Sequence, residues 1–468
     1  MSNLNAAVME DRPTRASAAR LDGLDWLRAG AAVLVVALHA GIAYLVAPMP
    51  GLAWATHDPV GSPFVDGVTW WINGFIMPLF FVQSGFLAAQ LMRQMGPHEF
   101  LQHRTRRLLG PLAFGCVLIL PLDLYAWLLG WAADGRIALR KLQSLKIDSP
   151  LGDNLWGVSH LWFLESLWVF CVAAWAVTWV ARWRKNAGEA DDCKLQISNL
   201  KSAIPNLQFA ISRSSTASMP RGVKGFIAAG LMTASTAALW WEPQVLIGFR
   251  HSWRPLPANL LFYGPWFVLG WIVQEWQFNT RGTLAEGNAL RRSELIPSSQ
   301  ALPFTRLCEC RILASLGLFA VLLPRIHQHV AAASSGLERV ALVGVFVLHA
   351  WLIVTGLIGV SLRWLNRRPP RAVKYLAEAS FWIYLFHHPV VGLTQISVSQ
   401  TGWPVAIKFG VTLLSGLALS LLTYHVLVRR TWVGALLNGR RFGVERRPEA
   451  PQLLPLPTPG AAPLRKSA

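Results

Sequence analysis

Charged side chains are scarce in this sequence. Lys, Arg, Asp and Glu make up 14% of the 468 residues, whereas 53% of the residues are hydrophobic and 23 are Trp. Soluble domains average about 25% charged residues, so the composition argues against a chain of several soluble domains. Apolar windows of about 20 residues recur instead, and a run of that length crosses a hydrocarbon core as a helix. We therefore predict an all-α, polytopic transmembrane helical bundle.

Cysteine is also rare. The five cysteines are Cys116, Cys171, Cys193, Cys308 and Cys310, and the last two form a lone C-x-C. This spacing matches neither a disulfide framework nor a zinc site. We predict no metal site and no bound cofactor.

Acidic residues are fewer than basic ones, 24 against 43, which gives a net charge of +19. A basic chain can bind nucleic acid, but these Lys and Arg lie between apolar runs and not on one face with stacking aromatics. We therefore expect membrane lipid around the chain and no nucleic acid. The charge is better explained by the rule that cytoplasmic loops collect positive residues.

The apolar runs predict about ten spans. They lie near 24–46, 66–91, 108–131, 158–181, 225–241, 259–276, 312–324, 340–362, 375–396 and 405–428. With the N-terminus inside, the cytoplasmic segments hold 33 Lys and Arg and the outside loops hold 7. This asymmetry predicts that both termini are cytoplasmic and that the protein is a multi-pass protein of a bacterial inner membrane.

The polar segments divide the chain. We predict a cytoplasmic tail at 1–20, a transmembrane domain at 21–430 with a cytoplasmic insert at 183–223, and a Pro-rich disordered tail at 431–468. The first apolar run is too long for a cleavable signal peptide, so we interpret it as an uncleaved anchor. No outside loop is long enough for a separate domain. Any chemistry must therefore occur within the bundle or at its mouths.

The first span carries two charges and an imidazole. Asp25 precedes Arg28 by three residues, so the two can pair on one helix. His39 follows Arg28 by eleven residues, which places both on one face, about 16 Å apart. An intramembrane charge costs about 2.5–3.5 kcal/mol and is usually functional or paired. The pair could stabilise the helix end, with His39 bonded to a neighbouring helix, or all three could belong to an active site.

Two further spans carry polar groups. In "FFVQSGF", Ser84 and Gly85 allow close approach of a helix or a substrate, so Ser84 is either part of a packing notch or a site residue. In "SHLWFLESLW", His160 and Glu165 are five residues apart and do not share a helical face, which argues against a dyad. Trp162 is either an interfacial aromatic or part of a site.

The ninth predicted span contains "SFWIYLFHHPVV". Tyr384, His387 and His388 fall in its second half, in the same outer half of the membrane as His39 and His160. Pro389 is expected to break the helix locally and free backbone groups.

On the predicted inner side, "RTRRLLGP" contains Arg104 and Arg107. These arginines are either ordinary positive-inside charge or a clamp for phosphate groups, which Arg binds through paired hydrogen bonds.

Together these blocks resemble the membrane acyltransferase-3 family. "LDWLRAGAAVLVVALH" is similar to its first-span pattern of Arg, ten residues and His, and "FFVQSGF", "RTRRLLGP", "HLWFL" and "SFWIYLFHHPV" resemble later blocks in the same order. The resemblance covers roughly residues 20–430 without the tails and the insert. "NGFIMPLFFVQSGFLAA" and "SFWIYLFHHPVV" look most like the branch of glucans biosynthesis protein C, which is thought to succinylate periplasmic glucans.

The resemblance implies transfer of an acyl group from cytoplasmic acyl-CoA, a co-substrate, to a carbohydrate or glycan hydroxyl on the outer side. It implies that His39 is the essential imidazole, that Arg28 is its motif partner, and that Arg104 and Arg107 help to hold the CoA phosphates. The second histidine, His388, departs from the pattern and leaves the base in that span ambiguous. Glu165 matches no family position.

Simple chemistry agrees with this implication. A neutral imidazole can take the proton of a sugar hydroxyl as the ester bond forms. Direct transfer and a transient acyl-enzyme on Ser84 or a His both remain open. The candidate catalytic residues are His39, Arg28, Asp25 and His387, and the candidate substrate-binding residues are Arg104, Arg107, Ser84, His160, Trp162, Glu165, Tyr384 and His388.

A proton-coupled transporter or flippase is the rival prediction, because intramembrane Arg, His and Glu also suit a carrier. Against it, the two halves of the chain show no repeat in hydropathy.

The sequence does not specify the acyl group: a succinyl group would call for an extra cation near the reaction centre, and the spans offer none that we can place.

Overall fold

The computed structural model describes residues 22–149, 151–199, 221–243, 245, 251–287, 304–332 and 335–438, and within these ranges all regular structure is helical. Six helical stretches in the described part are long and apolar enough to cross a membrane. The prediction of an all-α membrane protein is therefore confirmed, whereas the count of ten spans stays a prediction. The tail at 1–20 and most of the tail at 431–468 lie outside the described residues.

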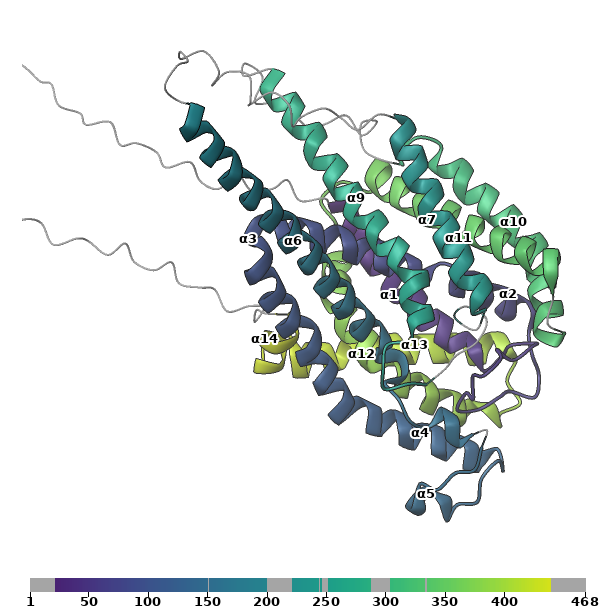
Figure 1. Cartoon of the computed structure of the whole chain (residues 1–468). Helices are drawn as coiled ribbons and strands as arrows, with labels where there is room; N and C mark the ends of the chain where they lie inside the picture. The colour runs from purple at the N-terminus through teal and green to yellow at the C-terminus, as the bar shows by residue number, and fades with distance from the viewer. Residues whose placement is uncertain are drawn as a thin grey trace, which may run out of the picture.

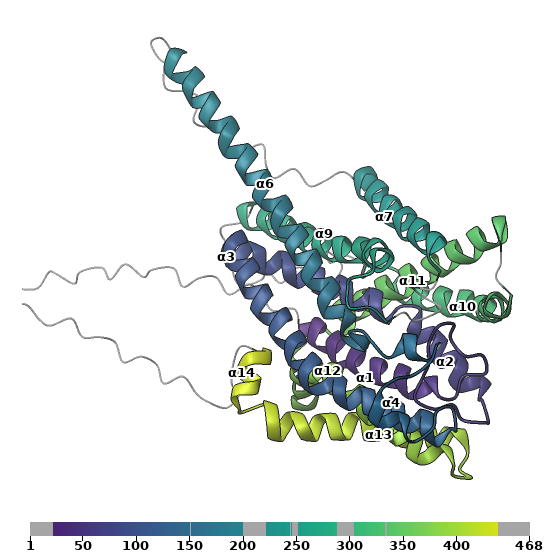
Figure 2. The same cartoon turned by 60° about the horizontal axis from the view of Figure 1, so that its bottom comes forward.

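The first half of the chain runs from the purple helix α1 to the teal helix α7 (Figure 1). Its helices are α1 (Asp22–Ile42), α2 (Pro63–Asn73), α3 (Ile76–Phe114), α4 (Leu120–Ala133), the short α5 (Lys141–Ser144), α6 (Trp162–Asn199) and α7 (Arg221–Trp241). A π-helical turn, η1 (Gly115–Ile119), joins α3 to α4, and 3₁₀ turns lie at η2 (Gly152–Asn154) and η3 (Ser159–Leu161). The predicted insert at 183–223 is thus helical at both ends, and Figure 2 shows α6 projecting beyond its neighbours.

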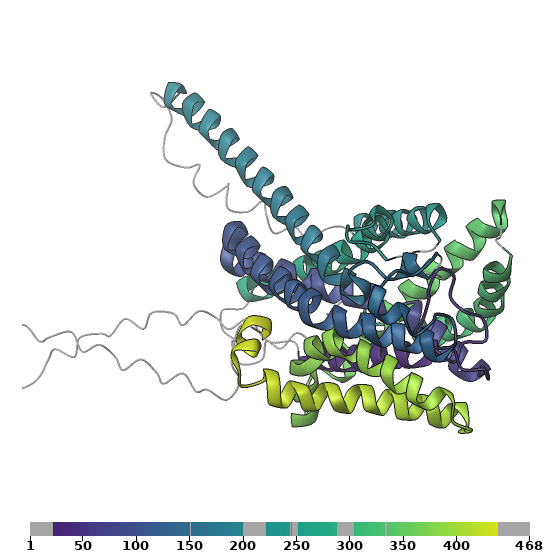
Figure 3. The same ribbon diagram turned by 90° about the horizontal axis from the view of Figure 1, so that it is seen from below.

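The second half contributes α9 (Pro257–Gly287), α10 (Cys308–Ala331), α11 (Gly336–Trp364), α12 (Arg371–Ser399) and α13 (Val405–Thr423). The π-helical turn η6 (Tyr424–Val428) and the short α14 (Trp432–Asn438) follow. Seen from below, α13 runs along one edge of the bundle and α14 turns back toward α3 (Figure 3). Each of the ten predicted spans falls on helix, although two of them share the nearly continuous helical stretch of α2, α3 and α4.

A kink divides α3. Gly96 has φ 79° and ψ 170°, a backbone conformation open to glycine, and Pro97 follows it. The segment that the sequence analysis left between two spans is therefore helical on both sides of a sharp bend. The bend redirects the second part of α3, which carries Arg104 and Arg107.

The helix α1 lies at the centre of the site-bearing half. It packs against α12, α2, α11 and α13, and α12 in turn packs against α4. Small residues let the neighbouring helices pack closely against α1. Four alanines of α1 are buried in these contacts: Ala29, Ala31, Ala32 and Ala40. The packing brings the C-terminal part of α1, α4 and the middle of α12 together, although they are far apart in the sequence.

The "SGF" block forms a close helix contact. A Cβ atom on Gly85 would lie 2.0 Å from the carbonyl oxygen of Phe267 on α9, and one on Gly270 would lie 1.9 Å from that of Val82 on α3. The two glycines therefore let α3 and α9 touch through their backbones. Gly85 thus has the packing role that the sequence analysis considered for this block.

Substituting Gly85 tests this contact. We expect Gly85→Val to lower the melting temperature in detergent, because the added atoms overlap backbone that cannot turn aside, and such overpacking costs about 1–3 kcal/mol. Gly410→Ala is the control, since nothing lies within 4 Å of a Cβ atom there. Equal melting temperatures for Gly85→Val and the wild type would contradict the tight contact.

Candidate active site

One pocket gathers five of the twelve predicted site residues, namely His39, His160, Trp162, Tyr384 and His388. It is a cavity of about 150 Å³ between the C-terminal part of α1, α4 and the middle of α12, and it is bordered by η3 and by the segments that precede α2, α6 and α9. Its polar lining includes His39, Asp123, Ser159, His160 and His388. Trp54, Trp127, Trp162, Tyr263 and Tyr384 supply aromatic walls.

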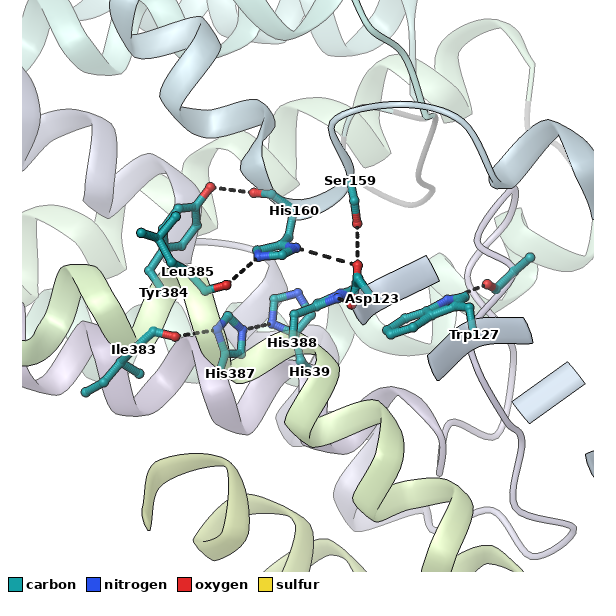
Figure 4. Close-up of polar contacts among 11 residues, drawn as sticks. His39, Asp123, Trp127, Ser159, His160, Ile383, Tyr384, Leu385, His387 and His388 are labelled. Carbon is teal, nitrogen blue, oxygen red and sulfur yellow. Dashed lines mark hydrogen bonds and ion pairs between the residues drawn. The ribbon is translucent and has the colours of Figure 1, made fainter. Parts of the chain in front are cut away.

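The first imidazole pair joins α1 to α12 (Figure 4). Nδ1 of His387 lies 2.7 Å from the carbonyl oxygen of Ile383, an oxygen that only accepts, so this nitrogen carries the proton. Nε2 of His387 is then an acceptor, and it lies 2.9 Å from Nδ1 of His39. The carbonyl oxygen of Val35 lies 2.9 Å from the same Nδ1.

These contacts fix the tautomer of His39. Both neighbours of its Nδ1 are acceptors, so Nδ1 carries the proton and Nε2 keeps a free lone pair. Within the described residues Nε2 makes no hydrogen bond, and His39 is only half-buried where it lines the pocket. His39 is therefore set up as a proton acceptor toward the pocket.

The second imidazole, His388, is held by a carboxylate. Its Nδ1 lies 2.6 Å from Oδ1 of Asp123 on α4, and Oδ2 of Asp123 accepts a hydrogen bond of 3.1 Å from the Ser159 hydroxyl. Asp123 is buried, with 5% of the residue exposed, and it belongs to the pocket lining. This arrangement leaves Nε2 of His388 as the second imidazole nitrogen that faces the pocket.

The third imidazole depends on Pro389. The helix α12 continues through this proline, so the expectation of a local break is wrong. Pro389 has no N–H, and the carbonyl oxygen of Leu385, four residues earlier, loses its usual helical donor. Nε2 of His160 supplies one at 3.1 Å, and the Tyr384 hydroxyl donates to the backbone carbonyl of His160. The proline thus creates the acceptor that anchors η3 to α12.

The spacing of Asp123, His160 and His388 would also allow a metal ion, because their ligand atoms lie within 4.8 Å of one another. The rings of His160 and His388 are stacked, however, with centroids 4.4 Å apart and planes 17° apart. An ion bound to both would have to lie in the plane of each ring, which two parallel rings at this separation do not allow. The direct hydrogen bond between His388 and Asp123 fits the geometry better.

Gln395 of α12 supports the backbone of His39. Its amide nitrogen donates to the carbonyl oxygens of His39 and Ala40 at 3.1 and 3.0 Å, and its amide oxygen accepts from Trp54 Nε1 at 2.7 Å. Trp54 lies parallel to His39, with ring centroids 5.8 Å apart. The end of α1 is therefore fixed on both sides.

A further histidine reaches the pocket from a connecting segment. His251 precedes α9 and lies outside the spans, and burial lowers its pKa to about 4 while Asp123 opposes the shift. His251 is consequently neutral near pH 7.

Other predicted residues lie away from this pocket. Arg28 and Asp25 face each other on α1, with 4.0 Å between the guanidinium and the carboxylate. Glu165 is half-buried on α6, and Ser84 is half-buried on α3. None of these four is part of the pocket lining.

The arginine motif lies on the second part of α3. The guanidinium of Arg104 lies over the ring of Phe100 at 5.8 Å, and its Nε is buried with no partner in the described part of the chain. Arg107 lines a separate, open depression with Arg106 and with Leu436 of α14. The structure therefore places the arginines and the imidazoles at two different sites.

The chain matches a known protein family. Residues 21–425 match the model of the acyltransferase-3 family, described as an acyltransferase domain. The chain belongs to this family. The resemblance in the sequence analysis is therefore confirmed, and the protein is a membrane acyltransferase of the acyltransferase-3 family.

Curated relatives include the glucans biosynthesis protein C of Escherichia coli K12 and that of Shigella dysenteriae serotype 1. Each is 23% identical to this acyltransferase over 369 residues, which cover 78% of its chain and 81% of the relative. No solved structure matches the chain.

Sequence reasoning missed several site residues of this acyltransferase, above all Asp123. It is the only charged residue in the predicted span 108–131, and an acid within a span is by itself a sign of function. Ser159, Gln395, Trp54 and Tyr263 carried no comparable sign, because single polar or aromatic residues near span ends are common.

Proposed function

We propose that this acyltransferase moves an acyl group from cytoplasmic acyl-CoA to a carbohydrate hydroxyl on the outer side of a bacterial inner membrane. The observation that carries the proposal is the setting of His39. Its Nδ1 is committed to Val35 and His387, and its Nε2 is left open toward a pocket with aromatic walls. In this role Nε2 takes the proton of the acceptor hydroxyl as that oxygen attacks the thioester carbon.

The aromatic walls support a carbohydrate acceptor. Trp54, Trp127 and Trp162 present flat apolar faces, and Tyr263 and Tyr384 add hydroxyl groups at their edges. Sugar rings have apolar C–H faces and polar rims, so such walls suit them. The relatives named glucans biosynthesis protein C favour the same class of acceptor.

A topology of ten spans with both termini cytoplasmic would place the imidazole pocket and the arginine motif on opposite sides of the membrane. Under it, the imidazole pocket faces the outer side and the arginine motif faces the cytoplasm, where acyl-CoA is made. Thr105, beside Arg104, accepts a hydrogen bond of 3.2 Å from Trp168 on α6, and His160 lies on η3, which directly precedes α6. The start of α6 and η3 thus connect the two sites.

An aromatic cluster lies between the two sites. Phe81 stacks on Tyr263 with centroids 4.8 Å apart and meets Phe163 edge-on at the same distance. The pantetheine arm of the donor would pass this cluster to bring the thioester to His39. We favour direct transfer over an acyl-enzyme on Ser84, because Ser84 is not part of the pocket lining.

The test is the release of free CoA by the purified protein in proteoliposomes. We expect release that requires both an acyl-CoA (acetyl-CoA or succinyl-CoA) and a glucan oligosaccharide, with a matching mass increase of the oligosaccharide. Empty liposomes are the control. Uptake of labelled oligosaccharide without CoA release or ester formation would contradict the enzyme and support the transporter.

A further inference from the structure

Two imidazoles in the pocket have opposite electrostatic settings. The Nδ1 of His39 is bound only by neutral acceptors, the carbonyl oxygen of Val35 and the ring of His387. The Nδ1 of His388 is bound by the carboxylate of Asp123. The two rings are edge to face, with centroids 5.0 Å apart. The pocket therefore holds two proton-transfer groups, and only one of them has a counter-charge.

A counter-charge stabilises the protonated form of an imidazole. In the Asp–His pair of serine hydrolases, the carboxylate orients the ring and stabilises the imidazolium. His388 is further fixed between two parallel neighbours, with the ring of Trp127 at 4.6 Å and that of His160 at 4.4 Å. Its Nε2 therefore has a defined direction, and Asp123 supplies the counter-charge for a proton on the ring.

The proposed acyl transfer requires a group that can donate a proton to the departing sulfur. A thiolate leaves easily in water, where a thiol titrates near pH 8.5, but burial disfavours the charged form. The pocket presents apolar side chains such as Leu38, Leu120 and Leu124 to the reacting group. A departing CoA sulfur is consequently costly there unless it receives a proton.

We propose that His388 is the general acid of the transfer and that Asp123 is its positioning residue. The inference rests on the proposed acyltransferase function and adds a second catalytic imidazole to it. His39 removes the proton of the acceptor hydroxyl, and protonated His388 gives its Nε2 proton to the sulfur. Ser159 holds the second oxygen of Asp123, so the carboxylate keeps its orientation.

The bonds and protons balance. The acceptor O–H bond breaks and its proton goes to Nε2 of His39, while the oxygen forms the new ester bond to the acyl carbon. The C–S bond breaks with its electron pair on sulfur, and sulfur takes the proton of His388. The cycle ends with His39 protonated and His388 neutral, and exchange of one proton between the facing rings restores the start.

Several titratable groups surround His388 and enter its pH response. They are His39 on α1, Asp123 on α4, His160 on η3, His251 before α9 and His387 on α12 itself. Asp123 is the only carboxylate in the pocket lining among the described residues. It lies 2.6 Å from Nδ1 of His388 and 3.8 Å from Nδ1 of His160, so its removal should act most strongly on the protonated form of His388, the closer ring.

The experiment is the pH dependence of kcat/KM for CoA release by the full-length protein in proteoliposomes. For the wild type we expect a bell-shaped dependence of kcat/KM on pH. The ascending limb reports deprotonation of His39, and the descending limb reports deprotonation of His388. Asp123→Asn should lower kcat about 10- to 100-fold and move only the descending limb, by about one pH unit or more toward lower pH. The shift has this sign because protonated His388 is lost sooner without the carboxylate.

His388→Asn is the second variant. Its amide nitrogen can still donate to Asp123, so the contact that supports folding is kept, but no Nε2 remains. We expect the descending limb to disappear. Asp66→Asn is the matched control, because Asp66 is a buried carboxylate whose Oδ2 lies 2.9 Å from His327, and neither residue is part of the pocket lining.

The outcomes separate the two proposals. A wild type that releases no CoA with any donor and acceptor would overturn the proposed function and this inference with it. An active wild type with an unchanged bell shape in Asp123→Asn, however low the rate, would overturn this inference alone and leave Asp123 a structural role. A descending limb that persists in His388→Asn would also overturn this inference and leave the proposed function standing.

Discussion

Replacing His39 with Gln is expected to lower acceptor-dependent CoA release about 100- to 10,000-fold, the range that a general base contributes. The reason is specific to one atom. Nδ1 of His39 already carries its proton toward Val35 and His387, so Nε2 is the base, and Gln supplies no basic nitrogen at that place. The measurement is kcat at saturating donor and acceptor, at matched protein amounts.

His349→Gln is the control for this variant. His349 is a fully buried histidine on α11, and its Nδ1 lies 3.0 Å from the Ser315 hydroxyl, away from the pocket lining. His387→Gln should fall between the two, because Val35 still accepts from Nδ1 of His39 when the second acceptor changes. Activity of His39→Gln within about threefold of the wild type would rule out His39 as the base and return the transporter to first place.

Reversing the charge at Arg104 and Arg107 is expected to raise the KM for acyl-CoA about 10- to 100-fold per residue and to leave the KM for the acceptor nearly unchanged. A charge-assisted hydrogen bond contributes about 1.5–3 kcal/mol, which corresponds to that range. Arg104 has a buried Nε without a partner in the described residues, and Arg107 lines an open depression. Both features suit guanidinium groups that bind phosphate oxygens.

The measurement is a pair of saturation curves for Arg104→Glu and Arg107→Glu, one for each substrate. Arg325→Glu is the matched control, because Arg325 is an exposed arginine on α10 that bonds Gln328, far along the chain from the motif. An equal rise in the KM of donor and acceptor, or no rise in either, would argue against a phosphate clamp and leave these arginines as positive-inside charge.

The sequence predicted the helical class and the candidate imidazoles because both depend on local information. Apolar length alone marks a helix that can cross the hydrocarbon core, and an imidazole within such a run is unusual wherever its partner lies. His39, His160, Tyr384, His387 and His388 could be placed in one half of the membrane from their positions along the spans. All five prove to gather at one pocket or at its wall.

The sequence by itself determined which residue types were available and at what depth, whereas the tertiary structure decided what each of them contacts. The packing of α1 between α12 and α2 brings His39 to His387, residues 348 positions apart. Contacts between distant helices depend on side-chain shape at each crossing, so the span pattern did not reveal that Asp123 holds His388 or that Ser84 is not part of the pocket lining. Pro389 was predicted to break its helix, but the neighbouring His160 supplies the hydrogen bond that the proline removes, and the helix continues.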